Sequence, residues 1–140
     1  MEKKELLKKL QEALEFEYTD IFLYNNEAEL FKKKIIDGDK IAKLYKNFAL
    51  DEITHADIIS KQIINIKGTP VWEYKNIPVS KSIRESLRSH LDREVAAYRN
   101  YTYLIEQVED RELKVLLKGI RENENEHIKQ ITDFLKRLKI

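Results

Sequence analysis

The chain has 140 residues, 36% of them charged and 42% hydrophobic, with only three Gly and two Pro, which is typical of one helical domain over residues 1–140. The net charge of +1 offers no excess that would favour nucleic acid or a membrane surface. Cysteine is absent, which excludes disulfides, thiolate catalysis, iron–sulfur clusters and cysteine-ligated zinc. The polar start and the lack of a run of 18 apolar residues predict a soluble, cytoplasmic protein without a membrane segment.

The first predicted element is a long helix over about residues 3–36. Its core-facing positions follow one another at steps of three or four, which is the spacing of one face of a helix. They are Leu7, Leu10, Leu14, Glu17, Ile21, Tyr24, Ala28, Phe31 and Ile35. Glu17 is the only charged residue among them, and we expect Glu12, Glu15, Glu27 and Glu29, which fall off this line, to face solvent.

The second predicted helix carries a carboxylate and an imidazole at neighbouring core-facing positions. Asp37, Gly38 and Asp39 are expected to end the first helix with a short turn, and the second helix then continues to about residue 66. Its core-facing positions are Ile41, Tyr45, Phe48, Glu52, His55, Ile59, Gln62 and Ile66. Glu52 and His55 form a Glu-x-x-His pair, and residues three apart on a helix point in the same direction.

The segment over residues 67–79 breaks the helical pattern. Gly68, Pro70 and Pro78 disfavour a continuous helix there. An extended segment of this length spans roughly 43 Å, and a helix of about 28 residues is about 42 Å long. The segment can therefore run the length of a helical bundle and make the second and third helices parallel. We expect Trp72 and Tyr74 to hold it against the bundle.

The third predicted helix begins at a serine. Ser80 or Ser82 is expected to cap it, and Ser82 together with Glu85 fits a capping box. The core-facing positions are Ile83, Leu87, His90, Glu94, Ala97, Tyr101, Leu104 and Val108. This line again contains one carboxylate among mostly apolar residues.

A turn near Glu109 and Asp110 leads to the fourth predicted helix. Its core-facing positions are Leu113, Leu117, Ile120, Glu124, His127, Ile131, Phe134 and Leu138. Glu124 and His127 form a second Glu-x-x-His pair. One such pair is close to chance because Glu is common in this chain, but two of only three histidines have this spacing, both of them at core-facing positions.

The two halves of the chain repeat one pattern. Glu17 is followed seven residues later by Tyr24, and Glu94 is followed seven residues later by Tyr101. Each of these helices precedes a helix that carries Glu-x-x-His. Two helical hairpins of this kind predict an all-α four-helix bundle with a pseudo-twofold axis and a long crossover between its second and third helices.

The polar core-facing residues are expected to form a metal site. They lie near the middle of their helices, so they should meet at one height. They are Glu17, Glu52, His55, Glu94, Glu124 and His127. Four buried carboxylates repel one another and resist ionisation, whereas two divalent cations balance their charge with both imidazoles neutral. Carboxylate and imidazole ligands suit iron, manganese or zinc. The alternative is a metal-free bundle with a satisfied polar layer.

Three further residues are expected beside this site. Tyr24 and Tyr101 are predicted to hydrogen-bond the site carboxylates, and either could supply an electron. Their alternative role is core packing with a satisfied hydroxyl. His90 lies one turn before Glu94 and is either a core histidine beside the site or a transient iron position on the path to it.

The six-residue pattern resembles the ferritin-like di-iron carboxylate superfamily over essentially the whole chain, with bacterioferritin and the erythrin domain of rubrerythrin as the nearest resemblances. The crossover from Gly68 and the third helix up to Glu94 are similar to those of bacterioferritin. Ala97 stands where rubrerythrins carry an extra Glu, and no Cys is present for a rubredoxin domain. Ile53 stands where bacterioferritin has its haem-ligating Met, so no haem is expected.

The short fifth helix of bacterioferritin cages has no counterpart after His127, so a homodimer through the outer faces of the first two helices is expected rather than a large cage.

The resemblance implies a di-iron oxidoreductase with two metal ions per chain that oxidises Fe²⁺ with O₂ or H₂O₂, in iron handling or protection from oxidative stress. By the same resemblance, Glu52 and Glu124 bridge the two ions, and Glu17 and Glu94 are terminal ligands. One alternative is a rubrerythrin-like peroxide reductase with an external electron donor. Two others are a di-metal oxidase acting on an organic substrate and a non-catalytic helical interaction module.

Overall fold

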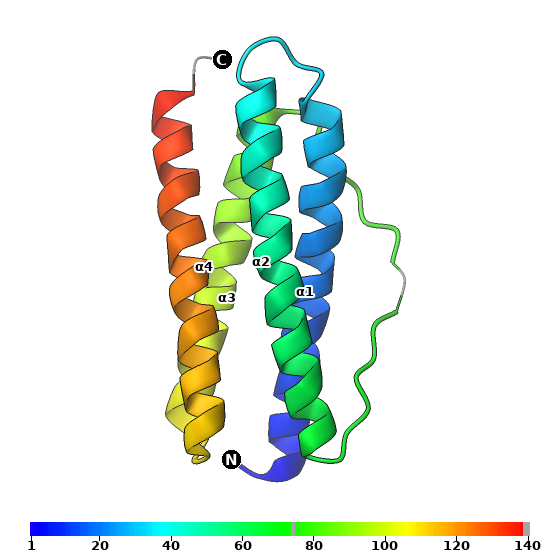
Figure 1. Cartoon of the computed structure of the whole chain (residues 1–140), viewed down its shortest axis with the longest axis vertical. Coiled ribbons are helices and arrows are strands. Elements are labelled where there is room, and N and C mark those ends of the chain that lie inside the picture. The colour runs from blue at the N-terminus through cyan, green and yellow to red at the C-terminus, as the bar shows by residue number, and fades with distance from the viewer. Residues whose placement is uncertain (74, 139–140) are drawn as a thin grey trace.

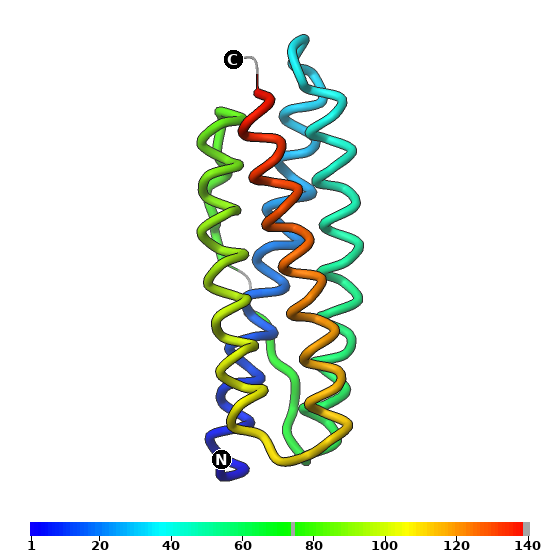
Figure 2. The backbone as a smooth tube through the Cα atoms, turned by 90° about the vertical axis from the view of Figure 1, so that its left-hand side faces the viewer, coloured from blue at the N-terminus to red at the C-terminus, as the bar shows by residue number. Residues whose placement is uncertain are grey.

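The computed structural model describes residues 1–73 and 75–138, and in these residues it contains four long helices and no strand. They are α1 (Lys3–Phe31), α2 (Gly38–Asn65), α3 (Ile83–Gln107) and α4 (Arg111–Arg137). Helices α1 and α2 form one antiparallel hairpin, and α3 and α4 form another (Figure 1). The crossover runs beside α1 along the bundle, so α2 and α3 are parallel (Figure 2). The predicted all-α four-helix bundle with a long crossover is confirmed. Within the described ranges, none of the helices is both long and apolar enough to cross a membrane.

The buried apolar residues form two clusters, one on each side of the middle of the bundle. The first core cluster, at the end where α1 begins, includes Leu10, Leu14, Ile59, Ile63, Leu113 and Leu117. The second core cluster, at the end where α1 finishes, includes Tyr24, Phe31, Ile41, Tyr45, Phe48 and Leu87. Burying each large apolar side chain contributes about 1.5–3 kcal/mol to folding. The core-facing lines of all four helices therefore hold the bundle together above and below a central layer.

The first helix is shorter than its periodicity predicts. It ends at Phe31, and Ile35, which we expected at a core-facing position, is 100% exposed. Asp37 adopts a left-handed conformation with φ 63°, and Gly38 is the first residue of α2 rather than part of a turn. A Cβ at Gly38 would lie 2.5 Å from the carbonyl oxygen of Phe31. Only glycine therefore lets α2 begin so close to the end of α1, and the turn must start earlier than predicted.

The end of α2 leads into the crossover through a Schellman motif. The N–H of Gly68 donates to the Ile63 carbonyl at 2.9 Å, and the N–H of Lys67 donates to the Ile64 carbonyl at 3.0 Å. Lys67 has φ 69°, a left-handed conformation that usually favours glycine. A Cβ at Gly68 would lie 2.2 Å from Cδ1 of Leu7 on α1. The small residue thus lets the chain turn closely against the first helix.

The crossover is held against α1 by polar and aromatic contacts. The Gln11 side chain accepts a hydrogen bond from the N–H of Val71 at 3.2 Å. The Trp72 ring lies 5.4 Å from the Tyr18 ring, so Trp72 contacts the bundle as expected. Tyr74, for which we predicted the same role, lies outside the described residues.

Both helices of the second hairpin have a side-chain cap, and the cap of α3 at Ser82 is the one that the sequence predicts. Ser82 Oγ accepts from the N–H of Glu85 at 3.4 Å at the start of α3. Asp110 Oδ1 accepts from the N–H of Leu113 at 2.9 Å at the start of α4. Such caps satisfy N–H groups that have no partner within the helix, and they set the register at which α3 and α4 present their polar residues.

Candidate metal centre

The six polar residues predicted at core-facing positions meet in the layer between the two apolar clusters. All six are buried, and His55, at 4%, is the most exposed of them. Their potential ligand atoms form two groups, and within each group these atoms lie within 4.8 Å of one another. The groups are Glu17, Glu52, His55 and Glu124, and Glu52, Glu94, Glu124 and His127. Glu52 and Glu124 belong to both groups, which is the arrangement expected for two neighbouring cations that share two carboxylates.

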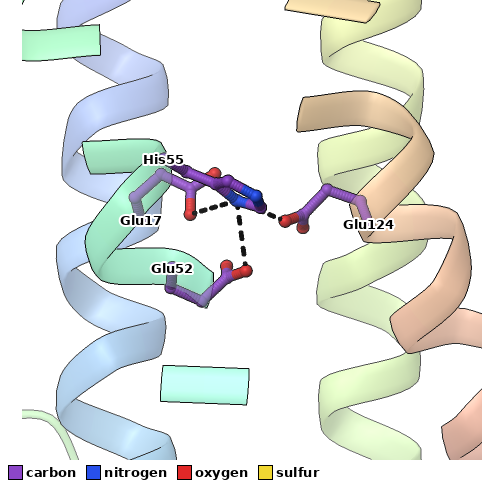
Figure 3. Close-up of side chains that lie close together, drawn as sticks. All are labelled: Glu17, Glu52, His55 and Glu124. Atoms are coloured by element: carbon purple, nitrogen blue, oxygen red, sulfur yellow. Dashed lines mark ion pairs between the residues drawn. The ribbon is translucent and has the colours of Figure 1, made fainter. Parts of the chain in front are cut away.

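The first group converges on one imidazole nitrogen (Figure 3). His55 Nδ1 lies 2.9 Å from Glu124 Oε1, 3.3 Å from Glu52 Oε1 and 3.4 Å from Glu17 Oε2. Glu17 comes from α1, Glu52 and His55 come from α2, and Glu124 comes from α4. Three helices therefore aim oxygen and nitrogen ligands at one point, and the Glu-x-x-His spacing accounts for the two that share a helix.

The second group is built in the same way around His127. Its Nδ1 lies 3.3 Å from Glu94 Oε1 and 3.4 Å from Glu52 Oε1. Its Nε2 lies 2.8 Å from Asp51 Oδ2, a partly exposed carboxylate that the periodicity of α2 did not single out. Because a carboxylate accepts, Nε2 donates its proton to Asp51, and Nδ1 is the nitrogen that faces the carboxylates of the group and would bind a metal ion once unprotonated. Burial lowers the pKa of His127, but the hydrogen bonds and charges of Glu94 and Asp51 outweigh burial and raise it.

The two predicted tyrosines hydrogen-bond carboxylates of the site. Tyr24 on α1 donates to Glu94 on α3 at 2.7 Å, and Tyr101 on α3 donates to Glu17 on α1 at 2.7 Å. The tyrosine of each helix thus donates to the glutamate of the other helix. These are the Glu and Tyr residues of the internal repeat in the sequence. Burial, followed by the negative charge of nearby carboxylates, raises the pKa of both phenols, so they stay neutral and remain donors.

The carboxylates differ in how readily they ionise. Burial and the charges of neighbouring carboxylates raise the pKa of Glu52 and of Glu124 well above the usual range. Burial also acts to raise the pKa of Glu94, but the neighbouring protons of Glu124, His127 and Tyr24 stabilise its ionised form and lower the pKa to about 2. The two carboxylates shared by both groups are thus the ones that keep protons when no cation balances them.

Several buried atoms of the layer have no well-formed hydrogen bond. Among the described residues they include both carboxylate oxygens of Glu52 and Glu124, one oxygen each of Glu17 and Glu94, and Nδ1 of His55. Buried polar atoms in folded proteins are nearly always paired. Their donor set of oxygen and imidazole nitrogen fits a metal such as iron, manganese or zinc. The cluster can therefore hold metal ions, which would supply the missing partners.

A second buried polar cluster lies one turn of α3 away from the site, and our expectation for one of its members was wrong. Glu27, which we expected to face solvent, is only 2% exposed. Its carboxylate accepts from His90 Nε2 at 2.6 Å, from Ser86 Oγ at 2.6 Å and from the N–H of Ser80 at 3.0 Å. His90 is buried, and its ring stacks on Tyr24 at 4.0 Å, so it is a core histidine beside the site and not a member of either ligand group.

A different line of residues on α1 explains why Glu27 is buried. Glu17, Asp20, Tyr24, Glu27 and Phe31 also follow steps of three and four, and all five are buried. It shares Glu17, Tyr24 and Phe31 with the predicted line and adds Asp20 and Glu27, which contact α3 through Arg93 and His90. The alternative spacing was the signal by which Asp20 and Glu27 could have been found.

Asp20 lies next to the metal cluster on the side of α1 and α3. Arg93 Nε donates to its Oδ1 at 2.5 Å, and the Arg93 guanidinium lies 3.9 Å from the Phe16 ring centroid. Burial raises the pKa of Asp20 in spite of Arg93. The arginine, stacked over the phenyl ring, covers this face of the bundle at the height of the site.

Fold and site together define a class of protein, namely four-helix bundles whose core carries a carboxylate and imidazole cluster able to hold metal. The family model of the ferritin-like domain, Ferritin, matches residues 7–140. The chain therefore belongs to the ferritin-like family, as its sequence pattern predicted.

Proposed function

We propose that this protein is a di-iron carboxylate oxidoreductase that oxidises Fe²⁺ with O₂ or H₂O₂, in iron handling or protection from oxidative stress. The observation that supports this most directly is the pair of ligand groups that share Glu52 and Glu124. In this proposal Glu17 and His55 complete one metal position, and Glu94 and His127 complete the other. The set of four Glu and two His, with Ala97 in place of the extra Glu of rubrerythrins, is the one that the resemblance to bacterioferritin implies.

The protein's own groups would hold the ions and balance their charge. Two Fe²⁺ ions, when bound, would supply the two electrons that with two protons from solvent reduce H₂O₂ to two molecules of water. Glu52 and Glu124, whose pKa values are raised in the metal-free site, release their protons as cations bind. Tyr24 and Tyr101 hold Glu94 and Glu17 in place through their hydroxyl groups.

The surroundings of the site favour a redox-active metal, such as the iron of this proposal, over zinc. Manganese and zinc share its preference for carboxylate and imidazole ligands. However, Tyr24 and Tyr101 place two buried phenols 2.7 Å from ligand carboxylates, where each can supply an electron to a redox-active metal. Zn²⁺ has no redox chemistry in proteins, so it would not accept an electron from either phenol.

Stoichiometric loading with Fe²⁺ tests the proposed activity. Anaerobic titration is expected to saturate near two ions per chain, and added oxidant should then produce the near-ultraviolet absorbance of a ferric product. Glu52→Ala removes a carboxylate common to both groups and should abolish that absorbance. Asp57→Ala, which removes an exposed carboxylate of the same helix, is the matched control and should leave it unchanged.

Two results would redirect this conclusion. Saturation well below two ions per chain would contradict a di-metal centre. A fast reaction with H₂O₂ combined with a slow reaction with O₂ would favour peroxide reduction with an external electron donor instead.

We also propose that the protein is a homodimer that pairs through the outer faces of α1 and α2. The outer face of α2 carries three exposed apolar side chains, Leu50 at 64%, Ile53 at 47% and Ile64 at 56%, and such residues on one side of a helix favour a partner surface. Light scattering is expected to give twice the 16.7 kDa chain mass, and Leu50→Lys combined with Ile53→Lys should give the monomer. A much larger assembly would contradict this expectation.

A further inference from the structure

Gly119 occupies a position in α4 that does not require glycine. It lies inside the helix Arg111–Arg137, where glycine is the least favourable residue apart from proline. No described glycine has a positive φ, and a Cβ at Gly119 would meet no atom within 4 Å. By contrast, Gly38 and Gly68 are each explained by a close atom. Neither backbone conformation nor packing accounts for Gly119, so the open space above it needs another explanation.

That space belongs to a groove between α2 and α4, the two helices nearest the viewer in Figure 1. Its volume is about 350 Å³, and its lining includes Asp51, Thr54 and His55 from α2 together with Gly119 and Asn123 from α4. His55 is the buried residue on which the first ligand group converges. The groove therefore leads from solvent to one edge of the candidate metal centre.

The groove lining contains the apolar residues Ile58, Val115, Leu116 and Ile120, but its polar residues suit a cation. Asp51, Thr54 and Asn123 offer oxygen atoms, and among the described lining residues there is no Lys or Arg. The Asp51 carboxylate also hydrogen-bonds His127 Nε2 at 2.8 Å. The groove is thus connected to the histidines of both ligand groups. His55 lines it directly, and His127 is hydrogen-bonded to the lining residue Asp51.

The face of α1 and α3 and the two ends of the bundle are obstructed. On the face of α1 and α3, the Arg93 side chain pairs with Asp20 and covers the Phe16 ring, which places a positive charge in front of an arriving cation. Along the bundle axis, the two apolar core clusters block the way from either end. The face of α2 and α4, by contrast, has a groove whose lining includes a ligand residue of the site.

We propose that divalent cations reach the centre through the groove between α2 and α4, passing Asp51 and His55, and that Gly119 keeps this route open. This inference rests on the di-metal centre proposed above. It assigns Gly119 a role in the rate of metal uptake and none in the affinity of the site.

Uptake of Co²⁺ by the metal-free protein tests this route, because Co²⁺ does not need an oxidant and its visible absorbance reports ligation. The series Gly119→Ala, Gly119→Leu and Gly119→Trp is expected to slow uptake in proportion to side-chain size, with Trp slower than the native chain by about tenfold or more. The number of Co²⁺ ions bound at equilibrium should stay unchanged. Lys118→Leu places the same side chain as Gly119→Leu at an exposed neighbouring position outside the groove and should load at the native rate.

The outcomes separate the route from the centre. If the native chain binds no Co²⁺, the di-metal centre fails and the route fails with it. If the native chain binds Co²⁺ but all three variants load at its rate, the route is wrong and the centre stands. A lower Co²⁺ stoichiometry in the variants would make Gly119 part of the structure of the site and would also overturn the proposal.

Discussion

Saturating the metal-free protein with Zn²⁺, or with Fe²⁺ under anaerobic conditions, is expected to raise its midpoint of thermal unfolding by about 15–20 °C. A ligand at about 100 times its Kd adds about 2.7 kcal/mol per site to the free energy of unfolding. For a chain of this length each kcal/mol corresponds to about 3–4 °C. Two sites therefore give an effect that differential scanning calorimetry measures easily.

The physical reason for this effect is the buried layer of carboxylates. Without a cation, burial and mutual repulsion keep protons on Glu52 and Glu124 and leave several oxygens without a hydrogen bond. These groups weaken the metal-free fold because unpaired buried polar atoms cost free energy. Cations supply the missing charge and the missing partners at once.

One pair of variants on α4 isolates this contribution. Glu124→Gln removes a carboxylate from both ligand groups, so the metal-free form should be at least as stable as the native chain while the rise on adding metal is lost. Glu122→Gln changes an exposed glutamate two residues earlier and should keep the full rise. An unchanged midpoint in the native chain on adding either metal would show that the layer is satisfied without one.

Removing Glu27 is expected to have the second largest effect. Glu27→Ala should lower the free energy of unfolding by about 3–5 kcal/mol, because it leaves three donors without their acceptor. These are the N–H of Ser80, the hydroxyl of Ser86 and Nε2 of His90. The loss should reach the core, since the Tyr45 hydroxyl lies 2.6 Å from Ser86 Oγ. Urea unfolding monitored by circular dichroism measures it.

A glutamate two residues along the same helix supplies the control for Glu27. Glu29 is exposed and pairs with Lys32 and Lys46 on the surface, so Glu29→Ala is expected to change stability little. Equal losses in Glu27→Ala and Glu29→Ala would show that the buried network contributes nothing beyond a surface ion pair.

The Glu27 carboxylate should also make the stability of the fold sensitive to acid. Burial raises the pKa of Glu27, but the hydrogen bonds and charge of His90 and the hydrogen bonds from Ser86 and Ser80 outweigh burial and lower it below the ordinary 4.5. The folded pKa is therefore lower than the unfolded one. The stability from Glu27 is fully present above the unfolded value and is lost as pH falls through the folded value. Glu27→Gln should lack this part of the pH dependence in urea unfolding curves recorded at several pH values.

Periodicity predicted most of the fold and the members of the candidate site, because the residues that face the bundle axis repeat at three and four in all four helices. Glu17 and Glu94 were found as single charges on otherwise apolar lines, and Tyr24 and Tyr101 through the internal repeat. The same rule missed residues that a neighbouring helix covers from the side. Asp20 and Glu27 are covered by Arg93 and His90 of α3.

Other features depend on distances that one sequence does not contain. Ile35 fits the helical spacing, yet α1 ends at Phe31 because the turn into α2 begins earlier. The groove beside Gly119 depends on how far apart α2 and α4 lie. Asp51 has its role because His127 of another helix lies 2.8 Å away. Each of these is set by the packing of helices against one another.

The sharing of ligands between the two hairpins has a consequence for assembly of the chain. Each ligand group takes three members from one hairpin and borrows one from the other, Glu124 in the first group and Glu52 in the second. A separate hairpin can therefore offer only an incomplete set to either cation. A bound cation therefore holds the two hairpins together. Tight binding of a cation also indicates that the two hairpins have docked in the correct register.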